Sequence, residues 1–224
     1  MNNEVKSLLD AADHVLIAFD GPLCTVFDPT TARVTADRLR ILLDPGLPRA
    51  VRGTGDPFEV LRYAQTCGAN TAYVIERQLA TYEAEAIAFG QATEGAVDAV
   101  HTLHASGHTV TAIGNQSTRT IRSFLTMHDL LGEVRRASAR DDFRTTALLP
   151  DPFLLGRAVE ALGTTPKRCL FITASADDAG AAASTGGMPV LAYGKAIPRR
   201  RAAATIESMT ELATPIDLLS WSGR

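Results

Sequence analysis

The feature that most constrains this chain is an apolar run that breaks into a turn, at residues 15–23. Its first three residues are apolar and two of them are β-branched, which is typical of a buried strand. An Asp-Gly-Pro turn begins at Asp20. Open α/β sheets carry their functional groups at such strand ends, so Asp20 is a candidate site residue. The alternative is structural, because an aspartate can hold a turn through hydrogen bonds to the backbone.

The rest of the chain divides into a helical stretch and an alternating stretch. Residues 28–90 contain several helix-like patterns and no strand-like run, with a loop expected at residues 44–57. From about residue 94, helix-like segments alternate with apolar runs. The strands expected there are 108–113, 132–137, 169–173 and 188–193. This order predicts an α/β fold with a parallel sheet covered by helices on both faces and a helical insertion after the first strand.

The composition excludes several classes of protein. With 224 residues, 46% hydrophobic and 21% charged, the chain suits a soluble protein of one large domain with a smaller insert. A net charge of −3 does not indicate a nucleic-acid partner. No apolar run approaches the roughly 18 residues of a membrane span, and the N-terminus lacks the apolar core of a secretory signal. Cys24, Cys67 and Cys169 are too few and too far apart for a disulfide framework or zinc site, which favours a reducing cytoplasm.

Two segments resemble the haloacid dehalogenase-like (HAD) superfamily. Residues 19–23, Phe-Asp-Gly-Pro-Leu, are similar to its first motif, and residues 161–187 are similar to the region of its fourth motif. The resemblance implies a Rossmann-like core with an α-helical cap inserted just after the first strand. It places the core at residues 1–27 and 91–224 and the cap at residues 28–90.

The resemblance also implies which positions carry the phosphoryl-transfer chemistry of the family. The nucleophilic aspartate corresponds to Ala18, and the general acid/base corresponds to Asp20. The phosphate-binding Thr or Ser corresponds to Gly114, and the lysine before Pro-Asp-Pro corresponds to Leu149. The first aspartate of the fourth motif corresponds to Ala174. Four of these five positions therefore depart from the family pattern.

The departures are mutually consistent. A methyl group cannot attack phosphorus, and Ala18 and Ala174 offer no carboxylate to magnesium, which prefers carboxylate and phosphate oxygens. Leu149 removes a positive charge, so a phosphate would meet Asp20 with nothing to offset the repulsion. We therefore expect magnesium binding to be weak or absent, with no other metal or cofactor, and no phosphoryl transfer.

The small and apolar residues at these positions predict a small-molecule cleft. The polar or thiol side chains expected near it, besides Asp20, are Asn115, Gln116, Ser175, Asp178 and Cys24. Asp20 is the candidate acid/base, because burial would raise its pKa and keep it partly protonated. Cys24 is expected to be a buried free thiol.

Three functions are compatible with this pattern. The first is a binding or accessory protein, for a small molecule or a protein partner, in a biosynthetic or regulatory pathway. The second is a metal-free enzyme that uses Asp20 for acid/base or cyclisation chemistry. The third is a residual phosphatase. The sequence specifies no oligomeric state, and its other polar clusters are expected to be surface or loop groups. These clusters are His101/His104/His108, Asp141–Asp142, Asp177–Asp178 and Arg199–Arg201.

Overall fold

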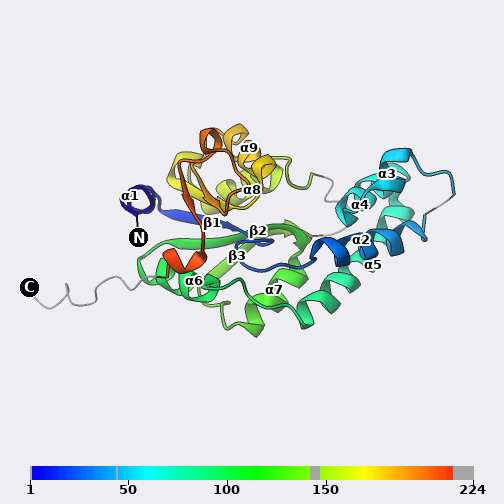
Figure 1. Ribbon diagram of the computed structural model, residues 1–224, viewed down its shortest axis with the longest axis horizontal. Coiled ribbons are helices and arrows are strands. Elements are labelled where there is room, and N and C mark those ends of the chain that lie inside the picture. The colour runs from blue at the N-terminus through cyan, green and yellow to red at the C-terminus, as the bar shows by residue number, and fades with distance from the viewer. Residues whose placement is uncertain (1, 44, 142–146, 214–224) are drawn as a thin grey trace, which may run out of the picture.

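The computed structural model describes residues 2–43, 45–141 and 147–213, built around a parallel sheet (Figure 1). The sheet has six strands in the order β3-β2-β1-β4-β5-β6. The strands are β1 (His14–Ala18), β2 (Thr109–Ser117), β3 (Val134–Arg140), β4 (Cys169–Thr173), β5 (Val190–Tyr193) and β6 (Ala204–Ile206). β1 is central because it pairs in parallel with both β2 and β4. The all-parallel sheet confirms the predicted α/β class and its Rossmann-like architecture.

Helices cover both faces of the sheet. These helices are α1 (Asn3–Ala11), α6 (Ala96–Ala105), α7 (Thr118–Met127), α8 (Phe153–Leu162) and α9 (Ala176–Ser184). Alternate side chains of β1 enter two different cores, as the strand period of two requires. Val15 and Ile17 pack in a cluster with α1, α6 and α7, whereas Leu16 and Ala18 pack in a cluster with α8 and α9. Both faces of β1 are therefore buried, which explains its continuous apolar sequence.

Four helices form a separate layer beyond one end of the sheet, which we call the cap (Figure 1). They are α2 (Pro29–Arg40), α3 (Arg49–Gly53), α4 (Pro57–Thr66) and α5 (Ala69–Ala88). α2 and α4 begin alike, with Asp28 and Asp56 as N-caps and a proline at the first helical position. The apolar core of the cap includes Leu39, Leu61 and Leu79 from three of these helices. The cap therefore has an apolar core of its own.

Three details of the expected element order were wrong. The loop expected at residues 44–57 contains α3, a helix of one turn and a half that buries Val51. The strand expected to end near residue 113 continues to Ser117, with a register shift against β3 between Ile113 and Ser117. β6 was not expected, because its three residues are too short to produce an alternating pattern. None of the helices in the described ranges is both long and apolar enough to cross a bilayer.

Candidate functional site

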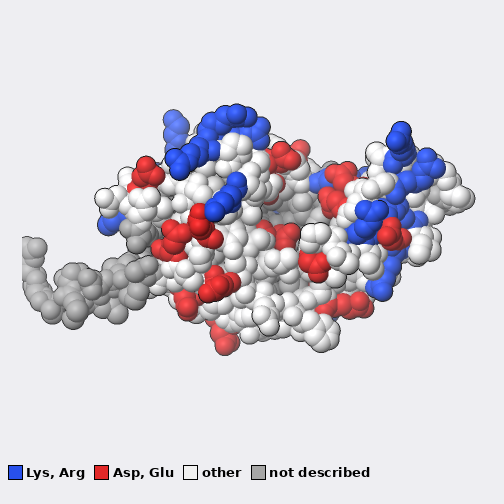
Figure 2. Space-filling model, in the orientation of Figure 1, with Lys and Arg blue, Asp and Glu red and all other residues white. Residues whose placement is uncertain are grey.

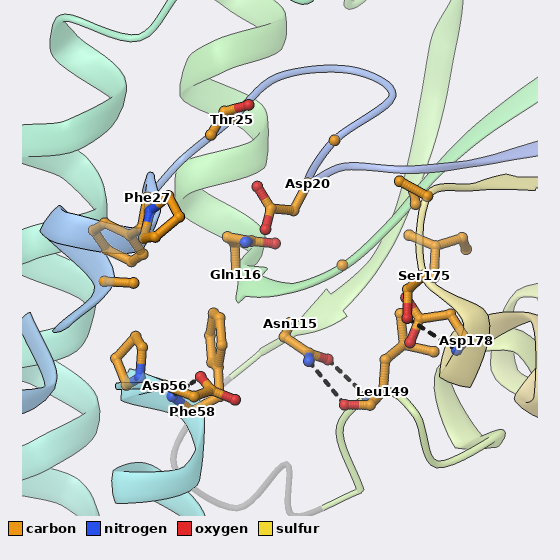
Figure 3. A pocket seen from close by; sticks show the side chains of 18 of the residues that line it. Asp20, Thr25, Phe27, Asp56, Phe58, Asn115, Gln116, Leu149, Ser175 and Asp178 are labelled. Carbon is orange, nitrogen blue, oxygen red and sulfur yellow. Dashed lines mark hydrogen bonds between the residues drawn. The ribbon is translucent and has the colours of Figure 1, made fainter. Parts of the chain in front are cut away.

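A cleft of about 670 Å³ opens where the carboxyl ends of β1, β2 and β4 face the cap. Figure 2 shows the hollow between the sheet core and the cap, and Figure 3 shows the side chains around it. The register of the sheet creates this convergence, because Ala18 pairs with Ile113 of β2 and Ile17 pairs with Ile172 of β4. The cleft is lined by nine of the predicted residues: Ala18, Asp20, Gly114, Asn115, Gln116, Leu149, Ala174, Ser175 and Asp178. Cys24 is not among its lining residues.

The floor of the cleft is apolar. Ala18 and Leu149 are 4% and 6% exposed, and both belong to the core cluster under α8 and α9. Gly114 makes room for a neighbouring amide, because a Cβ atom at this position would lie 2.7 Å from Gln116 Oε1. A threonine or serine at position 114 would therefore require Gln116 to move. The side chains at these positions are aliphatic or a hydrogen atom, so they include no nucleophile and no phosphate-binding hydroxyl.

Asp20 lies two residues beyond the end of β1, and its carboxylate projects into the cleft (Figure 3). The backbone N–H of Val26 donates to Asp20 Oδ1 at 3.2 Å. The turn itself is closed by backbone bonds from the Gly21 N–H to the Cys24 carbonyl and from the Cys24 N–H to the Phe19 carbonyl, so the Asp20 side chain holds the chain beyond the turn. The protein around Asp20 partly desolvates its carboxylate, which raises the pKa although the residue is exposed in the open cleft, and repulsion from Asp56 adds to the effect.

Asp178 faces the cleft from the first turn of α9. Its backbone N–H donates to Ser175 Oγ at 3.2 Å, so Ser175 acts as the N-cap of this helix. Burial raises the pKa of Asp178 to about 6, with further repulsion from Asp177 and Asp20 and an opposing contribution from hydrogen bonds. Near neutral pH this carboxyl is therefore close to its own titration range.

Asn115 and Cys24 have structural roles in this region. Asn115 Nδ2 donates to the carbonyl oxygen of Leu149 at 3.0 Å, and its Oδ1 accepts from the Leu149 N–H at 2.7 Å. The Asn115 amide therefore fixes the Leu149 segment at the edge of the cleft. Cys24 is a fully buried free thiol, as expected, and burial raises its pKa strongly, so it is not a thiolate at neutral pH.

Sequence reasoning missed the side of the cleft that the cap provides. Asp56, Phe27 and Phe58 line it, and the Phe58 N–H donates to Asp56 Oδ1 at 2.8 Å. Burial raises the pKa of Asp56, although the Arg62 guanidinium partly opposes this. The Asp-Pro pair indicated a helix start, but only the position of the cap over the sheet brings Asp56 to the cleft. In the part of the chain that the structure describes, the cleft is lined by three aspartates and by no lysine, arginine or histidine.

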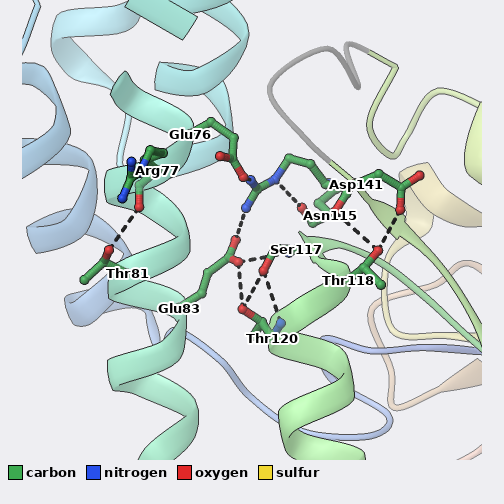
Figure 4. A network of polar contacts seen from close by, with 10 residues as sticks. Glu76, Arg77, Thr81, Glu83, Asn115, Ser117, Thr118, Thr120 and Asp141 are labelled. Carbon is green, nitrogen blue, oxygen red and sulfur yellow. Dashed lines mark hydrogen bonds and ion pairs between the residues drawn. The ribbon is translucent and has the colours of Figure 1, made fainter. Parts of the chain in front are cut away.

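A buried ion-pair network joins the cap to the core beside this cleft (Figure 4). Arg140, at the end of β3 and 0% exposed, donates to Glu76 and Glu83 of α5. Its Nε also donates to the Asn115 carbonyl at 3.1 Å. Glu83 Oε2 accepts from the Ser117 N–H at 2.9 Å and from the Thr120 hydroxyl at 3.0 Å. The network therefore fastens α5 to the strand ends that form the cleft.

Apart from Asp178, none of the described residues in the other predicted clusters lines the cleft. His101 and His104 are exposed, and His101 lies 3.2 Å from Glu133. Arg199–Arg201 form an exposed turn, and Asp177 is also exposed. Asp142 of the predicted Asp141–Asp142 pair lies outside the described residues. Within the described ranges, no group of three or more His, Cys, Asp or Glu side chains is placed to hold a metal ion.

Comparison with known proteins gives a structural match only. The sequence matches no family model and no curated protein. A HAD-superfamily hydrolase of subfamily IA from Geobacter sulfurreducens is 22% identical, with a TM-score of 0.60 over 90% of this chain and 95% of that chain. A haloacid dehalogenase-like hydrolase from Bacteroides fragilis is 20% identical, with a TM-score of 0.64 over 90% of this chain and 99% of that one.

A third match extends the same fold to a named type of phosphatase. A predicted phosphoglycolate phosphatase from Haemophilus somnus is 14% identical, with a TM-score of 0.65 over 90% of this chain and 96% of that chain. These matches cover both the sheet core and the cap. The chain therefore has the fold of the HAD-superfamily hydrolases, in the form that carries an inserted helical cap.

Proposed function

We propose that this chain binds a small molecule in its cleft and does not transfer phosphoryl groups. The observation that carries the proposal is the composition of the floor, which includes Ala18, Gly114, Leu149 and Ala174. No side chain at these four positions can act as a nucleophile, donate a hydrogen bond to phosphate or neutralise its charge. The small and apolar floor suits ligand binding instead.

The donor set does not fit a resident magnesium ion. Magnesium requires near-octahedral oxygen ligands, usually including carboxylates. Ala18 and Ala174 have no side-chain oxygen, and within the described ranges the carboxylates of Asp20, Asp56 and Asp178 are not grouped so that they could share one ion. We therefore propose that the protein works without a metal or cofactor.

Electrostatics support the same conclusion. A phosphate in the cleft would approach Asp20, Asp56 and Asp178, with no lysine, arginine or histidine among the described lining residues. Two like charges about 4 Å apart repel by roughly 4 kcal/mol at an effective dielectric constant of about 20. Such repulsion would oppose the binding of a phosphorylated substrate before any chemistry begins.

The test is phosphate release from a broad panel of phosphorylated metabolites, with magnesium and with a chelator. We expect no release above the blank from the wild type, and none from an Ala18→Asp variant, since the other three positions remain changed. An Asp20→Asn preparation controls for contaminating phosphatases, which would survive this substitution. Magnesium-dependent release that disappears in Asp20→Asn would overturn the proposal.

A second candidate function is metal-free acid/base catalysis by Asp20. The specific observation in its favour is that partial desolvation raises the pKa of Asp20, while among the described residues a single hydrogen bond, from the Val26 N–H, stabilises the carboxylate. A partly protonated carboxyl group in a cleft can donate a proton to a bound molecule. Turnover that resists chelators and is lost in Asp20→Asn would support this function, and turnover retained by Asp20→Asn would exclude it.

A further inference from the structure

We infer that the cleft binds a ligand that carries an amine or guanidinium cation on an apolar body. This inference rests on the proposed small-molecule function and specifies the chemical class of its ligand. It reverses the charge of the phosphate monoesters that the fold would suggest. Two independent features of the cleft carry it: the distribution of its carboxylates and a buried acceptor that has no donor.

The carboxylates approach the cleft from three directions. Asp20 follows β1, Asp178 stands in the first turn of α9, and Asp56 stands at the start of α4 in the cap. Within the described part of the chain, none of the three forms an ion pair. Desolvation by the surrounding protein is the main cause that raises the pKa of Asp20 and of Asp178, and repulsion from neighbouring carboxylates adds a smaller contribution in the same direction. A bound cation would relieve this repulsion.

Gln116 supplies the independent observation. This side chain is 1% exposed and lines the cleft, and its Oε1 atom has no hydrogen-bond partner among the residues that the structure describes. Buried polar atoms are nearly always paired, so an orphaned acceptor at a cleft wall needs an N–H or O–H donor from the ligand. Figure 3 shows Gln116 and Asp20 both among the side chains that project into the cleft. The Asp20 carboxylate and Gln116 Oε1 together offer acceptors to a group rich in hydrogen-bond donors.

Two donor side chains near the cleft, those of Asn115 and Arg62, are already engaged with protein groups. The Asn115 amide donates to the Leu149 carbonyl. The Arg62 guanidinium, the positive group that acts on Asp56, donates to Glu59 and to the Leu149 carbonyl, each at 2.6 Å. These two donors therefore have protein partners, whereas the three aspartates of the cleft have no ion-pair partner among the described residues.

The ligand is better described as organic than as a metal ion. The carboxylates are spread around the cleft, and within the described ranges no three acidic, His or Cys side chains are placed to share one ion. Phe27 and Phe58 line the cap side and can pack against an apolar body, and aromatic faces also attract organic cations. A cationic head near Asp20 and Asp178, with an apolar body toward the cap, would use both features.

The first experiment is a calorimetric titration of the whole chain with four matched compounds at about 0.15 M salt, where non-specific attraction is screened. The probes are 4-phenylbutylamine, 4-phenylbutylguanidine, the neutral 4-phenylbutanol and the anionic 4-phenylbutyrate. We expect the two cations to bind saturably and at least tenfold more tightly than the alcohol, with no binding of the carboxylate. Equal binding of amine and alcohol, tighter binding of the carboxylate, or no cation binding at millimolar concentration would each overturn the inference.

Variants locate the effect in the cleft. The double substitution Asp20→Asn/Asp178→Asn and the single substitution Gln116→Leu should each weaken amine binding at least tenfold. Asp177→Asn is the matched control, because it removes the same charge from the adjacent exposed residue, and it should leave the affinity within about twofold. Amine binding that survives the double substitution would overturn the inference, as would equal stabilisation by magnesium or calcium alone that the same variants abolish.

The outcomes also separate this inference from the proposed function. Magnesium-dependent phosphate release that Asp20→Asn abolishes would overturn the proposed function itself. Saturable binding of the neutral alcohol without any preference for amines would leave the small-molecule function standing and overturn only the cationic ligand.

Discussion

The cleft and the Arg140 network each contain acidic side chains from neighbouring elements. The acidic side chains of the network are paired with a cation, whereas those of the cleft have no ion-pair partner among the described residues. In the network, Glu76 and Glu83 share a guanidinium that is wholly buried. In the cleft, the described residues provide no ion-pair partner for the three aspartates, although backbone N–H groups donate to Asp20 and Asp56. The two regions lie on either side of the same strand ends, so this difference is local.

This contrast distinguishes carboxylates that stabilise the fold from carboxylates that remain available to bind a ligand. Every oxygen of Glu83 is used, because it accepts from Arg140, from the Ser117 N–H and from the Thr120 hydroxyl. Buried charges satisfied in this way fix the position of one element on another. Carboxylates that repel one another lower stability, and natural sites keep such groups where a ligand needs them. The predictions below test this division of roles.

The largest effect is expected from Arg140→Met, which leaves Glu83 buried without its cation. Loss of one partner of a buried pair costs about 3–5 kcal/mol, and we expect a loss of that size in the free energy of unfolding measured by urea denaturation. Arg168→Met is the control, because its pair with Asp13 is about half exposed, and its effect should be far smaller.

A second variant distinguishes the loss of stability caused by the broken ion pair from the loss caused by poorer packing of the side chain. Adding Glu83→Gln to Arg140→Met removes the orphaned charge, so it should recover more than about 1 kcal/mol. If Arg140→Met alone destabilises the protein by less than about 1 kcal/mol, the network does not fasten the cap, and the comparison with the cleft fails.

The next effect concerns binding and comes from placing a cation in the cleft itself. Leu149→Lys would supply the missing positive charge, which should lower amine affinity more than tenfold, or about 1.4 kcal/mol. Leu149→Met is the matched neutral control and should keep the affinity within about threefold. Wild-type amine affinity in Leu149→Lys, measured by calorimetric titration, would show that the cleft charge does not select the ligand.

A smaller effect is expected from Asp178→Asn, and its sign is opposite to that of Arg140→Met. The folded-state pKa of Asp178 is raised to about 6 by burial and by repulsion from Asp177 and Asp20. Its contribution to stability is therefore fully present below the unfolded pKa near 4 and is lost as the pH rises through 6. Asp178→Asn should stabilise the protein at pH 7 by about 1 kcal/mol, after allowance for solvent screening.

The measurement is urea denaturation of both proteins at several values between pH 3.5 and 7.5. The gain from Asp178→Asn should grow from near zero at the acid end to its full size above pH 6.5. A loss of stability at pH 7, or a gain that does not change with pH, would mean that this carboxylate is compensated in the folded protein after all.

The sequence was informative wherever a short segment carries the whole signal. The apolar run before Asp20 predicted the central strand, and the order of helix and strand patterns predicted the parallel sheet. The motif positions predicted the floor of the cleft, because residues at the carboxyl ends of neighbouring parallel strands meet by the register of the sheet. The domain boundaries at residues 27 and 90 remain a prediction.

The features that sequence missed depend on contacts between distant segments. Asp56 reaches the cleft only because the cap lies over the sheet. Arg140 and Glu83 are 57 residues apart, and neither belongs to a motif, so no local pattern predicts that they pair. The orphaned acceptor of Gln116 is likewise a property of the surrounding atoms. Sequence therefore predicted which residues form the floor of the cleft. The structure was needed to show which charged and polar side chains form its walls.

The smallest effect is expected from Asp177→Asn, which compares two adjacent aspartates in one helical turn. Asp177 is 83% exposed and its nearest cation, Arg201, is 4.0 Å away, so its removal should change the free energy of unfolding by less than about 0.5 kcal/mol. The stability of this variant should still fall between pH 4 and 6, because Asp178 is unchanged. Equal effects of the two substitutions at pH 7 would mean that the start of α9, rather than the cleft, determines the behaviour of Asp178. A larger effect of Asp178→Asn than of Asp177→Asn on the free energy of unfolding would show that the destabilising repulsion acts on the side chain that faces the cleft.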